Sequence, residues 1–336
     1  MSLQLEHIAL ELTDRCNLDC CYCYNIWKVP GAQRDRFDSY PKAIRALKQF
    51  FSHAAIRNVT LTGGETFMAE RVMEVALFCR MEGKSVTVIS NGTAGTEQQY
   101  KQLIDMGVTL FEMPVHSADE AVHDAITGVK GSWRKSTASL CAVRDLGGYP
   151  VAVIVLTRHN APGLGATLGY IASLGIKRIM LNRYNIGGRH TADPATVSAT
   201  HAGLRSAFRT ADDKAGELGL TITSNVCTPT CLLDPADYPR LGFGNCSPDP
   251  LRKPITLDIN GNIRLCNHSP VVAGNIFRQP LEEILYSPYS RSWGEIVPEY
   301  CAGCNLWERC LGGCRAASEQ CGLGLGAPDP ILTAMC

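Results

Sequence analysis

Three cysteines near the start of the chain have a spacing suited to an iron–sulfur cluster. Cys16, Cys20 and Cys23 stand in the string CNLDCCYC, and three thiolates at this spacing can each bind one iron of a [4Fe-4S] cluster, which leaves the fourth iron open for a small molecule. A zinc site is the alternative, but structural zinc needs four closed ligands and a fourth is not obvious nearby. Cys21 directly follows Cys20, and adjacent cysteines bind one metal poorly, so we expect Cys21 to be a buried or loop thiol.

The cysteines follow the first of several predicted strands. Residues 7–13 alternate and contain β-branched side chains, as a strand does. Six strands then alternate with helices, which predicts a parallel sheet with right-handed crossovers. The predicted strands are 7–13, 59–62, 86–90, 109–115, 151–157 and 178–182, and the predicted helices are one from Pro41 onward and those at 69–81, 97–106, 136–145 and 165–174. A helix at 202–218 and a strand at 220–224 are expected to bridge to the tail.

These motifs resemble those of the radical S-adenosylmethionine (SAM) superfamily. That family has a CxxxCxxC loop with an aromatic residue before the third cysteine, here Tyr22, and a GGE motif, here Gly63, Gly64 and Glu65 in LTGGET. The resemblance implies an α/β fold, a partial (β/α)6 TIM-like barrel. It also implies that the amine and carboxylate of SAM chelate the open iron, and that the glycines let the backbone approach the ligand while Glu65 accepts from its ammonium.

The last third of the chain is rich in cysteine and resembles the SPASM extension of radical SAM enzymes. It reads C-x14-G-x4-C and then C-x2-C-x5-C-x3-C, and the family places two auxiliary [4Fe-4S] clusters there, which makes three clusters in all. The resemblance assigns Cys246, Cys266 and Cys314 to the first auxiliary cluster, and Cys301, Cys304 and Cys310 to the second. We therefore predict a barrel domain over residues 1–225 and a SPASM domain over 226–336.

The fourth ligand of each auxiliary cluster has alternatives. For the first cluster we favour Cys231 over Cys227, and an open iron is a further alternative. For the second we favour Cys336 over Cys321 because Cys336 follows a PDP stretch, as the last ligand of the family tends to. Two zinc-ribbon sites are the alternative for the whole tail, since thiolate tetrads suit both metals.

Further polar residues end the later predicted strands, where the family contacts SAM. We predict cofactor contacts from Ser90 and Asn91 in ISNGT, Ser117 in PVHS, and Thr157 and Arg158 in LTRHN. Each motif can equally be a plain turn or rim residue. The stretch LNRYNIGGR places Asn182, Arg183 and Tyr184 at the barrel mouth, where we expect them to face substrate.

Two histidines are predicted to be catalytic. His116 ends the fourth predicted strand, although a solitary histidine is more often structural. Sulfatase-maturing SPASM members have a basic aspartate directly after the cysteine that corresponds to Cys266, whereas this chain has Asn267, which cannot take a proton. His268 is near enough to substitute for that aspartate. The formylglycine-forming reaction is therefore disfavoured.

Charge and the first residues limit the classes of partner. Lysine plus arginine total 32 and aspartate plus glutamate total 32, so the formal net charge is zero. The protein as a whole therefore has no excess positive charge that would attract nucleic acid or an anionic membrane. The opening MSLQLEHIALEL has no basic region followed by an apolar run, so we expect neither signal peptide nor membrane anchor and place the protein in the cytoplasm. Its cysteines are then expected to be reduced.

The resemblance implies an oxidoreductase that modifies a peptide or protein by cross-linking, oxidation or epimerisation. The alternative is a dehydrogenase or epimerase of a small polar metabolite such as an aminocyclitol or sugar, since no room precedes the first strand for a leader-binding domain. A peptide substrate would then need a separate recognition protein. An external electron donor such as flavodoxin or ferredoxin is implied. An electron carrier without catalysis is disfavoured, because it has no use for a SAM pocket.

Overall fold

The computed structural model describes residues 3–28, 38–108, 110–247 and 249–333. In this part of the chain one open sheet has the strand order β11-β10-β9-β1-β2-β3-β4-β5-β6-β7-β8, and the neighbours from β9 through β8 are parallel. The strands are β1 (Leu3–Glu11), β2 (Ala54–Thr62), β3 (Ser85–Ile89), β4 (Leu110–Pro114), β5 (Tyr149–Leu156), β6 (Arg178–Arg183), β7 (Thr221–Ser224), β8 (Leu241–Phe243), β9 (Ile255–Asp258), β10 (Asn262–Arg264) and β11 (Gly274–Asn275).

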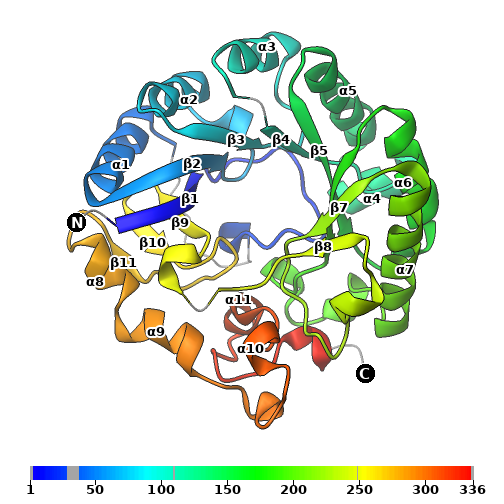
Figure 1. Ribbon diagram of the computed structural model, residues 1–336. Helices are drawn as coiled ribbons and strands as arrows, with labels where there is room; N and C mark the ends of the chain where they lie inside the picture. The colour runs from blue at the N-terminus through cyan, green and yellow to red at the C-terminus, as the bar shows by residue number, and fades with distance from the viewer. Residues whose placement is uncertain (1–2, 29–37, 109, 248, 334–336) are drawn as a thin grey trace.

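Helices cover the outside of the curved sheet, so the strands surround a central space (Figure 1). The helices are α1 (Tyr40–His53), α2 (Val72–Met81), α3 (Glu97–Asp105), α4 (Glu120–Thr127), α5 (Ser132–Asp145), α6 (Leu164–Ser173), α7 (His201–Leu218), α8 (Leu281–Leu285), α9 (Pro288–Glu295), α10 (Trp307–Cys310) and α11 (Arg315–Gln320). Central strands such as β5 (YPVAVIVL) are nearly continuous apolar runs because both of their faces are covered. The predicted α/β fold with a partial barrel is confirmed.

Helix α4 and strands β7 and β8 differ from the sequence expectation. Helix α4 was not predicted, yet its ends have ordinary signals: Asp119 accepts from the amides of Ala121 and Val122, and Gly128 ends the helix in a left-handed conformation (φ 73°). Strand β7 does not merely bridge to the tail. It pairs in parallel with β6, and β8 pairs in parallel with β7, so the sheet continues beyond six strands.

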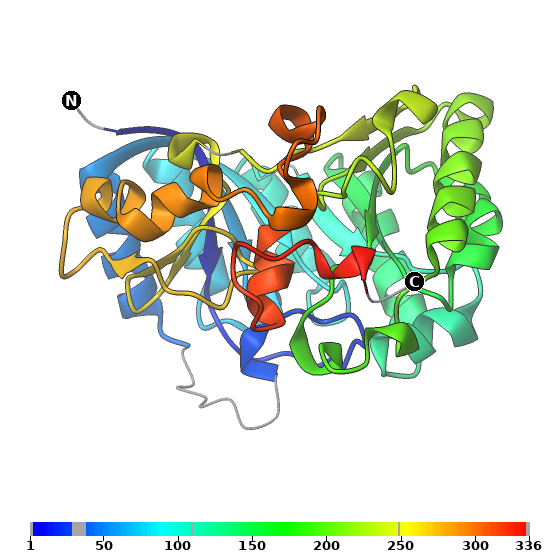
Figure 2. The same ribbon diagram turned by 90° about the horizontal axis from the view of Figure 1, so that it is seen from below.

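The cysteine-rich tail joins the barrel sheet at its other edge. Strand β9 pairs in parallel with β1, with Ile8 beside Ile255 and Leu10 beside Leu257, and β10 pairs antiparallel with β9. The helices α9, α10 and α11 follow and lie across the opening between β9 and β8 (Figures 1 and 2). The tail therefore spans both edges of the sheet.

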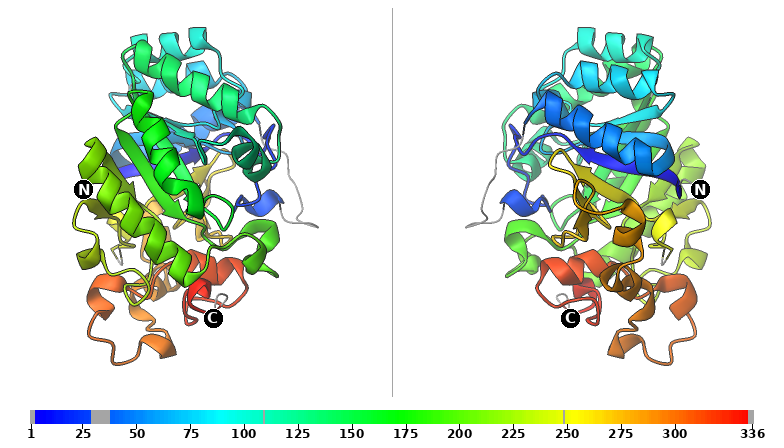
Figure 3. Two further views of the ribbon diagram at one scale, coloured as in Figure 1. Left: turned by 90° about the vertical axis from the view of Figure 1, so that its right-hand side faces the viewer. Right: turned by 90° about the vertical axis from the view of Figure 1, so that its left-hand side faces the viewer.

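The side views place the barrel helices and the tail on different sides of the strands (Figure 3). The cluster loop after β1 and the tail approach each other at the carboxyl ends of the strands, which is where the active site of such a barrel forms. Among the described helices, none combines the length and the apolar character needed to cross a membrane.

Candidate functional site

The loop that carries Cys16, Cys20 and Cys23 begins where β1 ends. Its backbone is held by helix α4, because the amides of Asp19 and Cys21 donate to the carbonyls of Thr127 and Ile126 at 3.0 and 2.9 Å. The amide of Cys23 donates to the carbonyl of Cys20. These contacts fix a short loop with three thiols, one buried and two partly exposed, and their binding of a cluster stays a prediction.

The GGE turn packs directly on the residues that precede the cluster loop. The amide of Gly64 donates to Thr13 O and that of Glu65 donates to Arg15 O, both at 2.7 Å. A Cβ at Gly63 (φ 145°) would lie 2.5 Å from Thr13 O, and one at Gly64 would overlap the carbonyl of Arg15. The glycines are thus required for backbone-to-backbone packing, which positions Cys16.

We expect Gly64→Ala to destabilise the protein by about 1–3 kcal/mol, because the added methyl group must displace the Arg15 backbone. It should also lower the iron content of the amino-terminal loop. Gly169→Ala is the matched control, since a Cβ at Gly169 in α6 meets no atom within 4 Å. Iron analysis and urea unfolding of both variants check this, and equal results for the two would contradict the packing role.

The buried carboxylate of Glu65 links the turn to the end of β3. It accepts from the hydroxyl of Ser90 at 2.8 Å, from the amide of Asn91 at 2.6 Å and from the amide of Phe67 at 3.0 Å. Burial raises the pKa of Glu65, while these hydrogen bonds oppose the rise. The Asn91 side chain in turn lies 3.9 Å from Cys16 Sγ. The structure therefore brings four predicted residues, Glu65, Ser90, Asn91 and Cys16, into one network.

His116 contacts the cluster loop through Tyr22. Its Nε2 lies 2.8 Å from the Tyr22 hydroxyl, and its Nδ1 accepts from the amide of Val155 at 3.3 Å. An accepting Nδ1 places the proton of the neutral ring on Nε2, which then donates to Tyr22. Burial lowers the pKa of His116 well below its usual value, so the ring is neutral. The arrangement makes His116 a residue that positions Tyr22, and its predicted catalytic role stays a prediction.

The other predicted SAM contacts lie at the ends of β4 and β5. Ser117 is buried; its carbonyl accepts from Trp133 Nε1 and its hydroxyl accepts from the amide of Asp119. Thr157 is buried and bonded to the Asn160 side chain. Arg158 is exposed and donates to the carbonyl of Ala195 at 3.1 Å. Among the described residues, the hydrogen bonds of these three side chains go to segments other than the cluster loop, and their SAM contacts stay predictions.

Two residues that support the cluster loop were missed in the sequence. Arg189 forms an ion pair with Asp19 and donates to the carbonyls of Asp19 and Cys20. Gly188 (φ 64°) approaches the loop so closely that a Cβ would overlap the carbonyl of Cys23. The sequence signal that could have indicated these two contacts is the string IGGR at 186–189, in which a glycine pair precedes a cation.

The residues predicted to face substrate from this segment do not do so. Arg183 is fully buried and forms an ion pair with Asp329, and it donates to the carbonyl of Cys227 at 2.8 Å. Tyr184 is buried, and its hydroxyl donates to the carbonyl of Gly187. The side chain of Asn182 accepts from the amides of Asn225 and Val226. The expectation was wrong because these side chains bind the tail backbone and nearby loops.

The first set of tail cysteines contains Cys227, not Cys231. Cys227 and Cys246 are hydrogen-bonded, which raises the pKa of Cys227 and lowers that of Cys246, and Cys227 also interacts electrostatically with Cys266 and Cys314. Burial raises the pKa of Cys266 to about 11. Cys227 therefore interacts with each of the other three thiols of this set, and four thiolates are the donors that a [4Fe-4S] cluster takes.

Cys231 joins the second set instead. Cys231 interacts electrostatically with Cys310 and Cys304, and Cys301 interacts with all three. In addition, the amide of Thr230 donates to Cys310 Sγ at 3.2 Å. The loop from Cys227 to Cys231 thus contributes its first cysteine to the first set and its last cysteine to the second set. The sequence alone did not reveal this division.

Cys336 and Cys321 were the two candidates for the fourth ligand of the second set. Cys336, our predicted fourth ligand, lies outside the described residues. Burial raises the pKa of Cys321 to about 11, and the negative charge of Asp329 adds to the rise. Within the part of the chain that is described, no three His, Cys, Asp or Glu side chains meet closely enough to hold a single metal ion.

Tyr24 connects the cluster loop to the first tail set. It directly follows Cys23, and its hydroxyl accepts from the Asn267 side chain at 2.8 Å. The His268 ring packs on Tyr24 with centroids 4.7 Å apart, and its Nε2 lies 3.3 Å from the carbonyl of Ile186. Burial lowers the pKa of His268 to about 3, so the ring is neutral. Its predicted role as a base stays a prediction.

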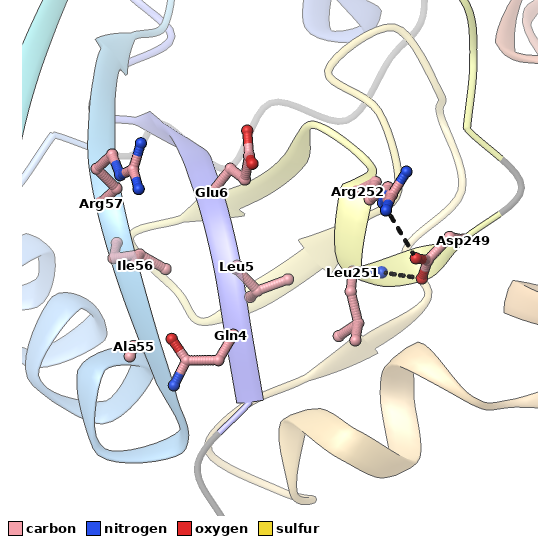
Figure 4. Close-up of a pocket in the computed structure, with 9 residues that line it drawn as sticks. All are labelled: Gln4, Leu5, Glu6, Ala55, Ile56, Arg57, Asp249, Leu251 and Arg252. Atoms are coloured by element: carbon pink, nitrogen blue, oxygen red, sulfur yellow. Dashed lines mark hydrogen bonds and ion pairs between the residues drawn. The ribbon is translucent and has the colours of Figure 1, made fainter.

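A cavity of about 460 Å³ lies at the opposite end of the barrel (Figure 4). It is lined by residues at the amino ends of β1 and β2 and by the segment before β9, including Glu6, Arg57 and Arg252. Cys16 lies beyond the carboxyl end of β1, and the strand residues from Leu5 to Glu11 alone span about 20 Å at the usual rise per residue. This cavity is therefore separate from the cysteine loop.

Comparison with known proteins agrees with both sets of motifs. Residues 10–161 match the model of the radical SAM superfamily, and residues 246–305 match SPASM, an iron–sulfur cluster-binding domain. The PqqA peptide cyclase of Xanthomonas oryzae pv. oryzae is 24% identical over 332 residues, which cover 96% of this chain and 86% of the relative. The PqqA peptide cyclase of Methylocella silvestris is 23% identical over 335 residues, with the same two shares.

Solved structures share the fold over nearly the whole chain. SuiB of Streptococcus suis bound to S-adenosylmethionine superimposes with a TM-score of 0.74 at 16% identity, covering 99% of this chain and 78% of that one. The structure of anSMEcpe with bound AdoMet gives a TM-score of 0.75 at 14% identity, covering 98% and 91%. These likenesses establish the architecture of both the barrel and the tail.

Proposed function

Because this chain is a radical SAM protein with a carboxyl-terminal SPASM domain, we propose that it cleaves SAM reductively and uses the resulting radical to modify a peptide. The observation that carries the proposal is the three-cysteine loop at the end of β1, supported by the GGE turn, in a chain whose relatives of similar length are named peptide cyclases. The reaction class is oxidoreductase, and the outcome we favour is an oxidative cross-link.

The protein's residues fit the cofactors that this chemistry needs. A [4Fe-4S] cluster with SAM supplies, when bound, an electron and a 5′-deoxyadenosyl radical able to take hydrogen from an unactivated C–H bond. Cys16, Cys20 and Cys23 would hold that cluster. The Glu65 network holds Asn91 beside Cys16, and His116 holds Tyr22 in the loop. His116 is buried, and the half-buried rings of Tyr22 and Tyr24 limit the access of water to this side of the site.

The tail would bind two further clusters. We assign Cys227, Cys246, Cys266 and Cys314 to the first, and Cys231, Cys301, Cys304 and Cys310 to the second, with Cys336 as a competing ligand for the second. A flavodoxin or ferredoxin is the electron donor we expect, and a separate protein would recognise the leader of a peptide substrate. Both partners are proposals that follow from the radical SAM class.

Deuterium transfer tests the substrate class. The anaerobically reconstituted protein is incubated with SAM, dithionite and deuterated peptides, beginning with the PqqA and SuiA precursors that the relatives' names supply. We expect deuterium in 5′-deoxyadenosine and a peptide that has lost two hydrogen atoms. A parallel arm uses deuterated aminocyclitols and sugars. Transfer from these compounds, with none from any peptide tried, would assign the enzyme to small polar metabolites instead.

A further inference from the structure

Two buried cations surround Cys246 of the first tail set. Lys253 is only 1% exposed, and its Nζ lies 3.7 Å from Cys246 Sγ and 4.4 Å from the centroid of the Trp293 ring. Arg315 directly follows Cys314 and is also buried, and it interacts electrostatically with Cys246 and with Cys301 of the second set. Arg315 therefore lies between the two cysteine sets.

The Arg315 guanidinium has unused donors. Its Nη2 donates to the carbonyl of Ile296 at 2.6 Å, but its Nε and Nη1 are buried and have no hydrogen-bond partner among the described residues. A buried donor without a partner costs about 1–3 kcal/mol, and more for a charged group. The sulfur atoms of a bound cluster are acceptors that would satisfy both nitrogen atoms.

Other buried cations near the tail cysteines are neutralised, but these two are not. Arg183 pairs with Asp329, and Arg264 pairs with Glu11. Within the described residues, neither Lys253 nor Arg315 forms an ion pair. Glu319 interacts electrostatically with Lys253, but its carboxylate accepts hydrogen bonds from the hydroxyls of Ser269 and Tyr289.

Unpaired buried cations are strongly unfavourable unless an anion accompanies them. Four thiolates on a [4Fe-4S] core carry a net charge of −2 when the cluster is oxidised and −3 when it is reduced. Burial alone disfavours the more highly charged reduced form, because a low dielectric penalises charge. Cations at the distance of Lys253 offset that penalty.

We propose that Lys253 and Arg315 raise the reduction potential of the first auxiliary cluster, so that this cluster accepts the electron that an oxidised substrate gives up. This inference rests on the proposed oxidative function. One substrate hydrogen atom goes to the 5′-deoxyadenosyl radical. A cluster held by Cys227, Cys246, Cys266 and Cys314 would take up the one electron that the substrate radical loses, and the accompanying proton would leave to solvent. Lys253 and Arg315 are positioning residues in this sense, since they act on substrate only through the cluster.

The test is an EPR-monitored redox titration of the reconstituted full chain. The background carries Cys16→Ala, Cys20→Ala and Cys23→Ala, so that only the auxiliary clusters contribute signals. We expect Lys253→Met and Arg315→Met each to lower the midpoint reduction potential of one auxiliary cluster. The expected decrease corresponds to at least a tenfold change in the equilibrium constant for reduction, which is about 59 mV for one electron. Arg252→Met is the matched control, because the side chain of Arg252 is 79% exposed and adjacent in sequence to Lys253, and its midpoint should not move.

Charge-conserving variants separate electrostatics from packing. Arg315→Lys and Lys253→Arg should keep the cluster and most of the potential. If a methionine variant loses auxiliary iron, recovery of the cluster in its charge-conserving partner supports the proposal, whereas loss in both shows a packing role and overturns it. Unchanged midpoints with full iron content also overturn it. These readouts do not require SAM cleavage, so a wild-type protein that makes no 5′-deoxyadenosine refutes the proposed function separately.

Discussion

Replacing Cys16 by alanine is expected to abolish formation of 5′-deoxyadenosine from SAM. The loop offers three thiols for three irons, and the open fourth iron exists for SAM only if all three are bound. Loss of one thiolate therefore removes the cluster or exposes a second iron. We expect at least a thousandfold decrease in SAM cleavage, measured by chromatography after incubation with dithionite, while iron bound by the tail remains.

Cys21→Ala is the matched control for this variant. Cys21 lies in the same loop, and its amide bonds to Ile126 O regardless of the side chain. Cys21 directly follows Cys20, and adjacent cysteines bind one metal poorly, so we do not expect the Cys21 thiol to be a ligand. Cleavage by Cys21→Ala should stay near the wild-type level. Wild-type SAM cleavage by Cys16→Ala, or an equal loss of SAM cleavage in both variants, would contradict the assignment of Cys16 as a ligand.

Arg183→Met should produce a large loss of stability. The ion pair of Arg183 with Asp329 has both side chains fully buried and joins β6 to the end of the described chain. Asp329 also accepts from the amides of Cys314 and Ile331, at 2.7 and 3.1 Å. Removing the cation leaves this carboxylate buried without a counter-charge, which costs about 3–5 kcal/mol. The midpoint of urea unfolding under anaerobic conditions measures the loss.

A surface ion pair provides the comparison. Lys101 and Asp105 are paired on α3 with side chains 61% and 60% exposed, so Lys101→Met should cost about 0–1 kcal/mol. Arg183→Met combined with Asp329→Leu should recover much of the loss, because no unpaired charge remains. A single variant as stable as Lys101→Met would show that the buried pair contributes little.

The loop and barrel were predictable because their signals are local. Cys16, Cys20 and Cys23 are separated by so few residues that the covalent chain alone keeps their thiols within reach of one cluster. The strands and helices of the barrel follow from apolar periodicity, but neither the short helix α4 between Asp119 and Gly128 nor the continuation of the sheet through β7 and β8 was predicted. The GGE motif was recognised, although its glycines serve packing on Thr13 and Arg15.

The contacts between distant segments were not predictable in the same way. Nothing in the string CTPTC indicates that Cys227 faces Cys246 while Cys231 faces Cys310, since this depends on Arg183 and Thr230 holding the loop. Arg183 itself was expected at the mouth because a cation after a strand commonly binds ligand. Its carboxylate partner, Asp329, lies 146 residues away in sequence.

The amino-acid sequence by itself determined the chemistry of this protein: thiolates at ligand spacing, a glycine turn that follows a strand, and the alternation that forms a parallel sheet. Only the tertiary structure decided which thiolates share a set, and which buried cations lie beside them. The physical reason is that covalent geometry limits neighbours along the chain, whereas the pairing of β9 with β1 and the burial of charges are settled by packing between segments far apart in sequence.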